Sequence, residues 1–143
     1  VLACDFTVAQ EGLSWRMPAC ALGLHYYPSG LRRYLSRFGL NASKRAFLLG
    51  QSLSFEDLAK LDLFEALVPA ASFETALSAL IDTLQAMSPL ALQATKKSLN
   101  EIGAGLYCEP VLKERSRQSV HSADFAEGRA AFLEKRAPVF RRR

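Results

Sequence analysis

The segment at residues 22–30, LGLHYYPSG, gathers the side chains most able to do chemistry. It holds an imidazole, two phenols and a hydroxyl beside a proline and two glycines, which set backbone geometry. A tyrosine hydroxyl is a neutral, rigid hydrogen-bond donor. A helix that begins at the end of the segment would add backbone N–H groups that help to hold an anion. The segment is therefore the first candidate for a polar site.

Each of these residues also has a purely structural interpretation. Tyr26 and Tyr27 would pack over the helix that follows. His25 would be an ordinary loop histidine, and Pro28 and Gly30 would only set the turn. The sequence leaves both interpretations open.

The elements around this segment change from extended to helical. Val1–Ala9 is short, apolar and partly β-branched, which predicts a strand, and Leu13–Met17 predicts a shorter extended piece. After the segment, apolar residues recur at helical spacing from Leu31 to Phe38 and stop at Gly39. Asn41 is the predicted N-cap of the next helix, which runs to Gly50.

The remainder is predicted to be helical apart from one strand, Phe64–Val68. A capping box at Ser54 predicts a short helix, and Ser88 followed by proline predicts the start of a longer one. The longer helices are expected at residues 73–84, 88–102, 110–120 and 124–135. Because isolated strands are not stable without partners, and because Val1–Ala9 is as apolar as a strand covered on both faces, we expect further strands upstream. A first residue other than methionine supports this expectation.

Length and composition fit one domain or a large piece of one. The chain has 143 residues, half of them apolar, and no apolar run approaches the ~18 residues of a membrane helix. We expect a cytoplasmic protein that does not enter a membrane. The odd number and wide spacing of Cys4, Cys20 and Cys108 argue against a disulfide frame or a metal site. Cys4 and Cys20 are predicted to be small core residues.

The net charge is +4, and the basic residues cluster within residues 32–45 and at 141–143. A nucleic-acid surface usually interleaves aromatic residues with such charges or shows a known binding module, so nucleic acid is not favoured as a partner. A phosphorylated small ligand such as coenzyme A would need only a few of these charges. Solvated helix faces would account for the others.

Several segments, in the same order along the whole chain, resemble the crotonase superfamily of enoyl-CoA hydratases and isomerases. The matching segments are Leu2-Ala-Cys-Asp5, Met17-Pro-Ala19 with Leu22-Gly-Leu24, Pro28-x-Gly30 with Leu31-Arg-Arg-Tyr-Leu35, Ser88-Pro-Leu-Ala91 with Lys96-Lys-Ser-Leu-Asn100, and Ser122-x-Asp124-x-x-Glu127-Gly128 with Ala131–Arg136 and Pro138-x-Phe140. Each match alone is weak, but five in register resemble the C-terminal half of such an enzyme.

The resemblance implies an α/β fold, the ClpP-like spiral of ββα units, of which this chain holds a mostly helical part with one or two edge strands. Residues 1–70 would complete the core, and residues 71–143 would form the helical trimerisation region of a homo-oligomer, a trimer or a dimer of trimers. The substrate would be an acyl-CoA thioester, with coenzyme A as part of the substrate and no tightly bound cofactor. Its enolate would be held by two backbone N–H groups that lie upstream of Val1.

The same resemblance aligns Ala19 with the second of two glutamates that the family's hydratases use. A methyl group cannot transfer a proton, which excludes hydration by paired carboxylates. The loop around Tyr26 is similar to that of methylmalonyl-CoA decarboxylases, which also lack this glutamate. Tyr26 is therefore the first catalytic candidate and His25 the second. Pro28, Ser29 and Gly30 belong with Ala19 to the expected active-site loop.

Near the other end, Phe132 and Lys135 match family positions that contact coenzyme A from the neighbouring subunit. An aromatic face stacks on adenine and an ammonium meets a phosphate. In the alternative interpretation, Phe132 belongs to an apolar stripe with Phe125, and Lys135 is solvated.

The sequence therefore predicts an acyl-CoA lyase or isomerase of fatty acid metabolism when full length, decarboxylase- or isomerase-like rather than a hydratase, with this part alone inactive. Two alternatives stay open. One is a non-catalytic assembly protein or RNA-contacting relative, and the other is an inactive truncated fragment.

Overall fold

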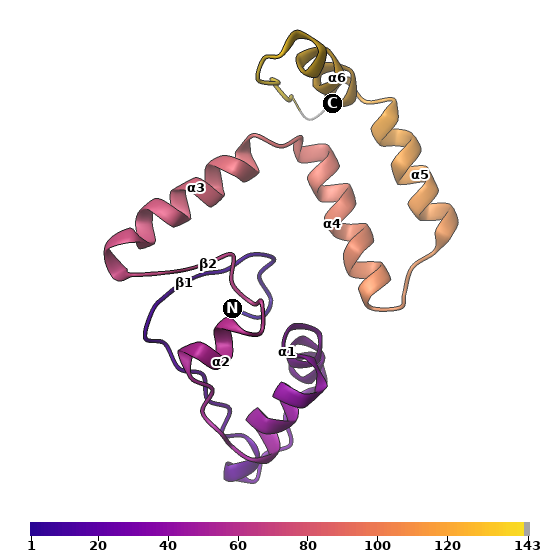
Figure 1. Cartoon of the computed structure of the whole chain (residues 1–143). Helices are drawn as coiled ribbons and strands as arrows, with labels where there is room; N and C mark the ends of the chain where they lie inside the picture. Colours follow the sequence, from indigo (N-terminus) through magenta and orange to yellow (C-terminus); the bar gives the residue numbers. More distant parts are fainter. Residues whose placement is uncertain (142–143) are drawn as a thin grey trace. The chain divides into compact units, whose positions relative to one another are not determined.

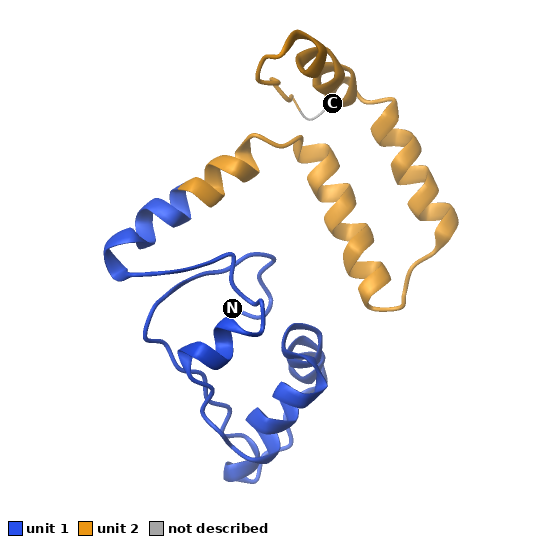
Figure 2. Cartoon of the chain, in the orientation of Figure 1, with its two compact units in different colours: residues 1–78 blue, residues 79–143 orange. Residues whose placement is uncertain are grey.

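The computed structural model describes residues 1–141 (Figure 1). The chain divides into two compact units, residues 1–78 and residues 79–143, and the division falls inside one helix, α3 (Figure 2). Each unit has its own helices and its own hollow, and each is described separately.

Two short strands pair in the first unit. β1 (Val8–Gln10) and β2 (Ala66–Val68) run parallel, with Val8 opposite Ala66. Glu11 N–H donates to Val68 O at 2.9 Å, and Glu65 N–H donates to Thr7 O at 2.9 Å, which extends the ladder by one bond at each end. A parallel pair needs a long crossover, and most of the first unit is that crossover.

The predicted strand Val1–Ala9 is wrong over its first seven residues. Cys4 N–H donates to Val1 O at 2.9 Å, which bends this segment into a turn. Ladder bonds to a neighbouring strand begin only at Thr7 in the described chain. An apolar pattern indicates burial, but it does not supply a pairing partner.

Helix α1 (Pro28–Leu48) contains a break at Gly39, whose φ is +70° and ψ 172°. The predicted helix end at Gly39 is confirmed. The predicted N-cap at Asn41 is wrong, because Gly39 alone leaves helical geometry within α1 and an N-cap must be non-helical. Glycine can adopt the conformation at the break, because that region of φ/ψ space is open almost only to glycine.

The core of the first unit is built from both parts of α1. Tyr34 and Phe38 are buried one helical turn apart before the break at Gly39, and Ala42 and Phe47 are buried after it. The buried Ala19, Leu53 and Leu58 from other segments complete the cluster.

Trp15 joins the core from outside the helix. Its Nε1–H donates to the Tyr34 hydroxyl at 2.7 Å, and its ring meets Phe38 edge-on at 5.6 Å. Trp15 and Leu53 exchange two backbone hydrogen bonds of 2.9 and 2.8 Å. The predicted extended piece Leu13–Met17 is thus reduced to a single antiparallel bridge.

Short helix α2 (Phe55–Ala59) begins with the predicted capping box. The Asp57 N–H donates to Ser54 Oγ at 3.2 Å, and the Ser54 N–H donates to Asp57 Oδ2 at 3.1 Å. A 3-10 turn, Ala70–Ser72, then leads into α3 (Phe73–Gln85). The loop before α1 holds another such turn, Cys20–Leu22.

The second unit contains the end of α3 and three further helices, α4 (Pro89–Gly103), α5 (Glu109–Val120) and α6 (Ala123–Glu134). Their number and type agree with the predictions, and Ser88 caps α4 as predicted. Arg115 of α5 forms a two-pronged ion pair with Glu101 of α4, at 2.6 and 2.9 Å. None of the helices in residues 1–141 is both long and apolar enough to cross a membrane.

The prediction that Cys4 and Cys20 are small core residues is wrong. Cys4 and Cys20 are both exposed in the structure, as is Cys108. Cys4 lies in the N-terminal turn, and Cys20 begins the 3-10 turn beside the buried Ala19. Small apolar side chains favour burial only where the local backbone faces the core.

The break in α1 gives a testable prediction. In Gly39→Ala an alanine must adopt a glycine-only conformation, so we expect a loss of about 1–3 kcal/mol of unfolding free energy. Gly103→Ala is the matched control, because a Cβ at either position meets nothing within 4 Å. Gly103 lies in α4, so alanine there should stabilise by up to about 1 kcal/mol. Equal effects in denaturant titrations would contradict the assigned break.

Candidate functional site

The loop before α1 is folded around Ala19. Leu24 N–H donates to Ala19 O at 2.8 Å, and Leu22 N–H donates to Pro18 O at 3.0 Å. Gly23 closes the turn with φ +73°. The Ala19 methyl is 3% exposed and packs into the aromatic core. Residue 19, which the resemblance aligns with a hydratase glutamate, is therefore a buried alanine in this structure.

The two loop tyrosines lie against each other and against the core. The ring of Tyr26 is 4.3 Å from that of Tyr27 and 5.5 Å from that of Phe47, between centroids. It also meets Tyr34 edge-on at 6.3 Å. The structural interpretation of Tyr26, packing over the following helix, is thus confirmed, and it does not exclude a chemical role.

The hydroxyl of Tyr26 remains polar and neutral. It donates to the Tyr27 hydroxyl at 3.4 Å, near the upper limit for a hydrogen bond. Two effects raise the pKa of Tyr26 above its usual value. The larger is this hydrogen bond, and the second is burial. The hydroxyl therefore stays protonated at physiological pH and can act as a hydrogen-bond donor, whereas it would be a weak base.

Gly30 allows the tyrosines to cover the start of α1. A Cβ at residue 30 would lie 2.3 Å from Tyr26 Cε1 and 2.9 Å from Tyr27 Cε2. Both distances are far shorter than side chains tolerate, so any larger residue would displace the rings. Pro28 and Ser29 begin the helix beside them.

A hollow of about 240 Å³ lies beside these tyrosines. Its lining residues are Val1, Leu2, Ala3, Trp15, Tyr26, Tyr27, Gly30, Arg33 and Tyr34. The structure thus brings Tyr26 and Gly30 together at one hollow, but His25, Pro28 and Ser29 do not line it. We name it the tyrosine hollow.

The sequence analysis missed Trp15 and Arg33 in this hollow. Arg33 follows Gly30 by three residues on α1, so the two share a helix face. That spacing could have placed Arg33 beside the loop. Trp15 gave no such signal, because it arrives through its bridge to Leu53.

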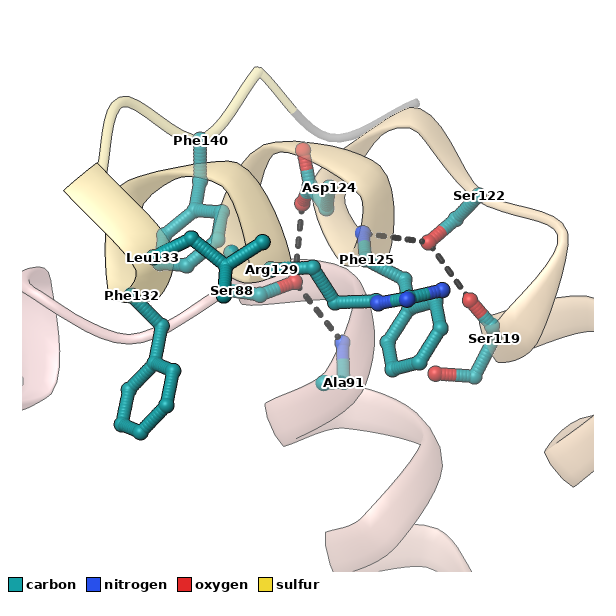
Figure 3. Close-up of a pocket in the computed structure, with 11 residues that line it drawn as sticks. Ser88, Ala91, Ser119, Ser122, Asp124, Phe125, Arg129, Phe132, Leu133 and Phe140 are labelled. Atoms are coloured by element: carbon teal, nitrogen blue, oxygen red, sulfur yellow. Dashed lines mark hydrogen bonds between the residues drawn. The ribbon is translucent and has the colours of Figure 1, made fainter.

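The second unit has a hollow of about 370 Å³ along α6 (Figure 3). Phe125, Arg129 and Phe132 stand at helical spacing on one side of α6 and line it. The Arg129 guanidinium lies 5.9 Å from the centroid of the Phe125 ring, a cation–π geometry. We name it the α6 hollow.

Phe132 and Lys135 differ in their relation to the α6 hollow. Phe132 lines it and is 83% exposed, so its ring face is open to a ligand. Lys135 ends α6 in a left-handed conformation, with φ +54°, and is not among the lining residues. The predicted apolar stripe of Phe125 and Phe132 exists, but both rings are exposed in the described chain.

The C-terminal segment lines the α6 hollow with Phe140, which the sequence analysis did not consider as a site residue (Figure 3). Ser88, the N-cap of α4, also lines it. Within residues 1–141, no group of three or more histidine, cysteine or acidic side chains could hold a metal ion.

The comparisons with known proteins agree over the full length of the chain. The family profile described as enoyl-CoA hydratase/isomerase matches residues 1–143. Among curated proteins, the 2,3-dehydroadipyl-CoA hydratase of Escherichia coli is 30% identical over 145 residues, which cover 99% of this chain and 56% of that protein. The carnitinyl-CoA dehydratase of Salmonella typhi is 28% identical over 149 residues, covering 99% and 57%.

Solved structures match equally well. A protein of Hyphomonas neptunium assigned to the enoyl-CoA hydratase/isomerase family superposes with a TM-score of 0.89 at 29% identity, over 99% of this chain and 55% of that one. The enoyl-CoA hydratase of Mycobacterium tuberculosis gives 0.86 at 28% identity, over 99% and 57%. The predicted fold class, part of a crotonase-type α/β fold, is confirmed. The chain spans about half the length of these relatives.

The contact at Gly30 predicts the effect of one methyl group. Gly30→Ala should displace Tyr26 and lower the unfolding free energy by about 1–3 kcal/mol. Gly128→Ala is the matched control, because its Cβ would meet Phe140 at an ordinary 3.6 Å. We expect that change to stay within about 1 kcal/mol. Unchanged Tyr26 ring signals in NMR spectra of Gly30→Ala would contradict the assigned packing.

Glu127 of α6 gives a pH prediction. The Arg136 guanidinium, and next the Val139 N–H, lower the pKa of Glu127 from 4.5 to about 2. A lowered pKa in the folded state stabilises the fold at pH values above 4.5, and that stabilisation is lost as the pH falls toward 2. The stability difference between wild type and Glu127→Gln should therefore shrink across this window in denaturant titrations. A constant difference from pH 6 to pH 2 would contradict the assigned ion pair.

Proposed function

The chain belongs to the enoyl-CoA hydratase/isomerase family, and from that premise we propose that the protein acts on an acyl-CoA thioester by way of an enolate. We further propose a decarboxylase- or isomerase-like reaction in place of hydration. The observation that carries this proposal is the burial of Ala19, at the position that the resemblance aligns with a hydratase glutamate.

Hydration needs a group that activates water and another that delivers a proton to the α-carbon. Ala19 can do neither. It is buried in the same core cluster as Tyr34, Phe38 and Leu53, where an unpaired carboxylate would be costly. A reaction that avoids proton abstraction at this point is therefore favoured.

Decarboxylation meets that condition. When the bond between the α-carbon and the carboxylate breaks, CO₂ leaves and the electron pair stays on the α-carbon, delocalised onto the thioester oxygen. A proton that derives from solvent water then adds to the α-carbon. The enzyme needs donors for the enolate oxygen and a group that orients the departing carboxylate. It does not need a strong base.

Tyr26 fits the orienting role in the tyrosine hollow. Its neutral hydroxyl could exchange the long bond to Tyr27 for a bond to a carboxylate oxygen. The hydroxyl is protonated at neutral pH, so it is available as a donor and not as a base, which favours decarboxylation over isomerisation for a reaction that relies on Tyr26. His25 is the second candidate and would supply the base that an isomerase requires.

We also propose that the α6 hollow contacts coenzyme A. Phe132 would stack on adenine and Lys135 would meet a phosphate, from the neighbouring subunit of a trimer or a dimer of trimers assembled through residues 71–143. Coenzyme A would be present only as part of the thioester. The proposed setting is fatty acid metabolism in the cytoplasm.

The buried Ala19 also fits a non-catalytic relative, for example an assembly or RNA-contacting protein, and an inactive truncated chain. Such a protein would turn over none of the acyl-CoA thioesters. Binding of RNA that weakens steeply with salt would then support the RNA-contacting alternative.

Tyr26→Phe tests the proposal. The wild-type protein from its natural source would be compared with recombinant variants of the same chain. We expect kcat/KM for a malonyl-type CoA thioester to fall roughly 10- to 100-fold, as for a lost hydrogen bond to a charged group. Tyr27→Phe removes the neighbouring hydroxyl as a matched control and should change kcat/KM by less than about threefold. Equal effects of the two variants would contradict the role of Tyr26.

A further inference from the structure

The chain reverses direction at the end of α6. Lys135 adopts the left-handed conformation, and Arg136 N–H donates to Ala131 O at 3.0 Å, which closes the helix with a reversal typical of C-caps. We name residues 136–141 the return segment. Non-glycine residues rarely adopt this conformation, so contacts beyond Lys135 must hold the reversal in place.

Glu127 holds the return segment at two points. Its carboxylate accepts two hydrogen bonds from the Arg136 guanidinium, at 2.5 and 2.9 Å. It also accepts the Val139 N–H at 2.8 Å. The Glu127 side chain is 25% exposed and that of Arg136 is 40% exposed, so this pair is partly shielded from water.

Asp124 holds the far end of the same segment. It is 3% exposed and accepts the Arg141 N–H at 2.9 Å. It also accepts the Ser88 hydroxyl at 2.8 Å, and Ser88 caps α4 through the Ala91 N–H. The return segment is thereby tied to the starts of both α4 and α6.

These ties place Phe140 on α6. Its ring lies 3.6 Å from the position of a Cβ on Gly128, and both residues line the α6 hollow. Figure 3 shows the Phe140 ring beside α6. Phe132 and Arg129 line the same hollow from the helix itself. One wall of the hollow therefore depends on a segment that Glu127 holds in position.

We propose that Glu127 is a positioning residue for the coenzyme A end of the substrate. Through Arg136 and Val139 it fixes the return segment, and with it Phe140, so that the α6 hollow keeps the shape that accepts an adenine ring beside Phe132. Glu127 itself does not touch the ligand. This inference rests on the proposed function of the α6 hollow.

Binding of free coenzyme A, measured by calorimetry on the intact protein, tests the proposal without requiring turnover. Glu127→Gln should raise the Kd roughly tenfold, because its neutral amide loses the charge-assisted pair that fixes the segment. Glu134→Gln is the matched control. Glu134 accepts Arg136 Nε–H at 2.6 Å but holds no backbone group of the return segment, so its Kd should change by less than about twofold.

Two further measurements separate positioning from general damage. At saturating acyl-CoA, kcat of Glu127→Gln should match wild type, and KM for the corresponding pantetheine thioester, which lacks the nucleotide, should be unchanged. Phe140→Ala leaves the ion pair intact and should also weaken coenzyme A binding. It provides a second test if Glu127→Gln folds poorly.

Equal Kd values for wild type and Glu127→Gln would overturn the proposal, as would equal KM increases for the two thioesters. If wild type turns over acyl-CoA and Glu127→Gln has the same Kd for coenzyme A and the same KM values, the positioning role alone is refuted. Wild type that neither binds coenzyme A nor turns over its thioesters would refute both the positioning role and the proposed function.

Discussion

The first unit depends on the packing of aromatic rings around Tyr34. Its ring lies 5.1 Å from Phe38 and 4.7 Å from Phe47, and its hydroxyl accepts the Trp15 indole N–H. Edge-to-face contacts of this kind add to the stabilisation from burial. Because Tyr26 packs on the same cluster, the proposed active-site loop and the core of the unit share one set of contacts.

The same packing bears on the chemistry that we propose for residue 19. Ala19 begins the loop and is buried in the same cluster. Burial of an unpaired carboxylate there would be costly, so the packing that holds Tyr26 in place also opposes a glutamate at residue 19. On our account, the loss of the hydratase group and the placement of the tyrosine pair are two results of a single packing arrangement.

Much of this could be predicted from the sequence, because the signals were local. The capping box at Ser54, the Ser88-Pro89 start of α4 and the glycine at residue 39 are decided by neighbours within a few residues, and the structure contains each. The prediction of a strand over Val1–Ala9 was wrong because strand pairing depends on a partner that is distant in the sequence. Cys20 was misplaced because its exposure depends on how the 3-10 turn faces the core.

The sites show the same division. The spacing of Phe125 and Phe132 follows from helical periodicity, whereas the return of Phe140 onto α6 requires the left-handed Lys135 and the acceptors Asp124 and Glu127. The hydrogen bonds that Asp124 and Glu127 accept from the return segment leave no periodic pattern in the sequence.

The most direct test of the central claim is the partition of products formed by the wild-type protein from its natural source. The protein would be incubated in D₂O with a malonyl-type CoA thioester and, separately, with an enoyl-CoA, and the products followed by NMR. Our account predicts CO₂ release with one deuterium incorporated at the α-carbon of the malonyl-derived product, and no addition of water to the enoyl-CoA. Efficient hydration of the enoyl-CoA, with Ala19 in place, would contradict it.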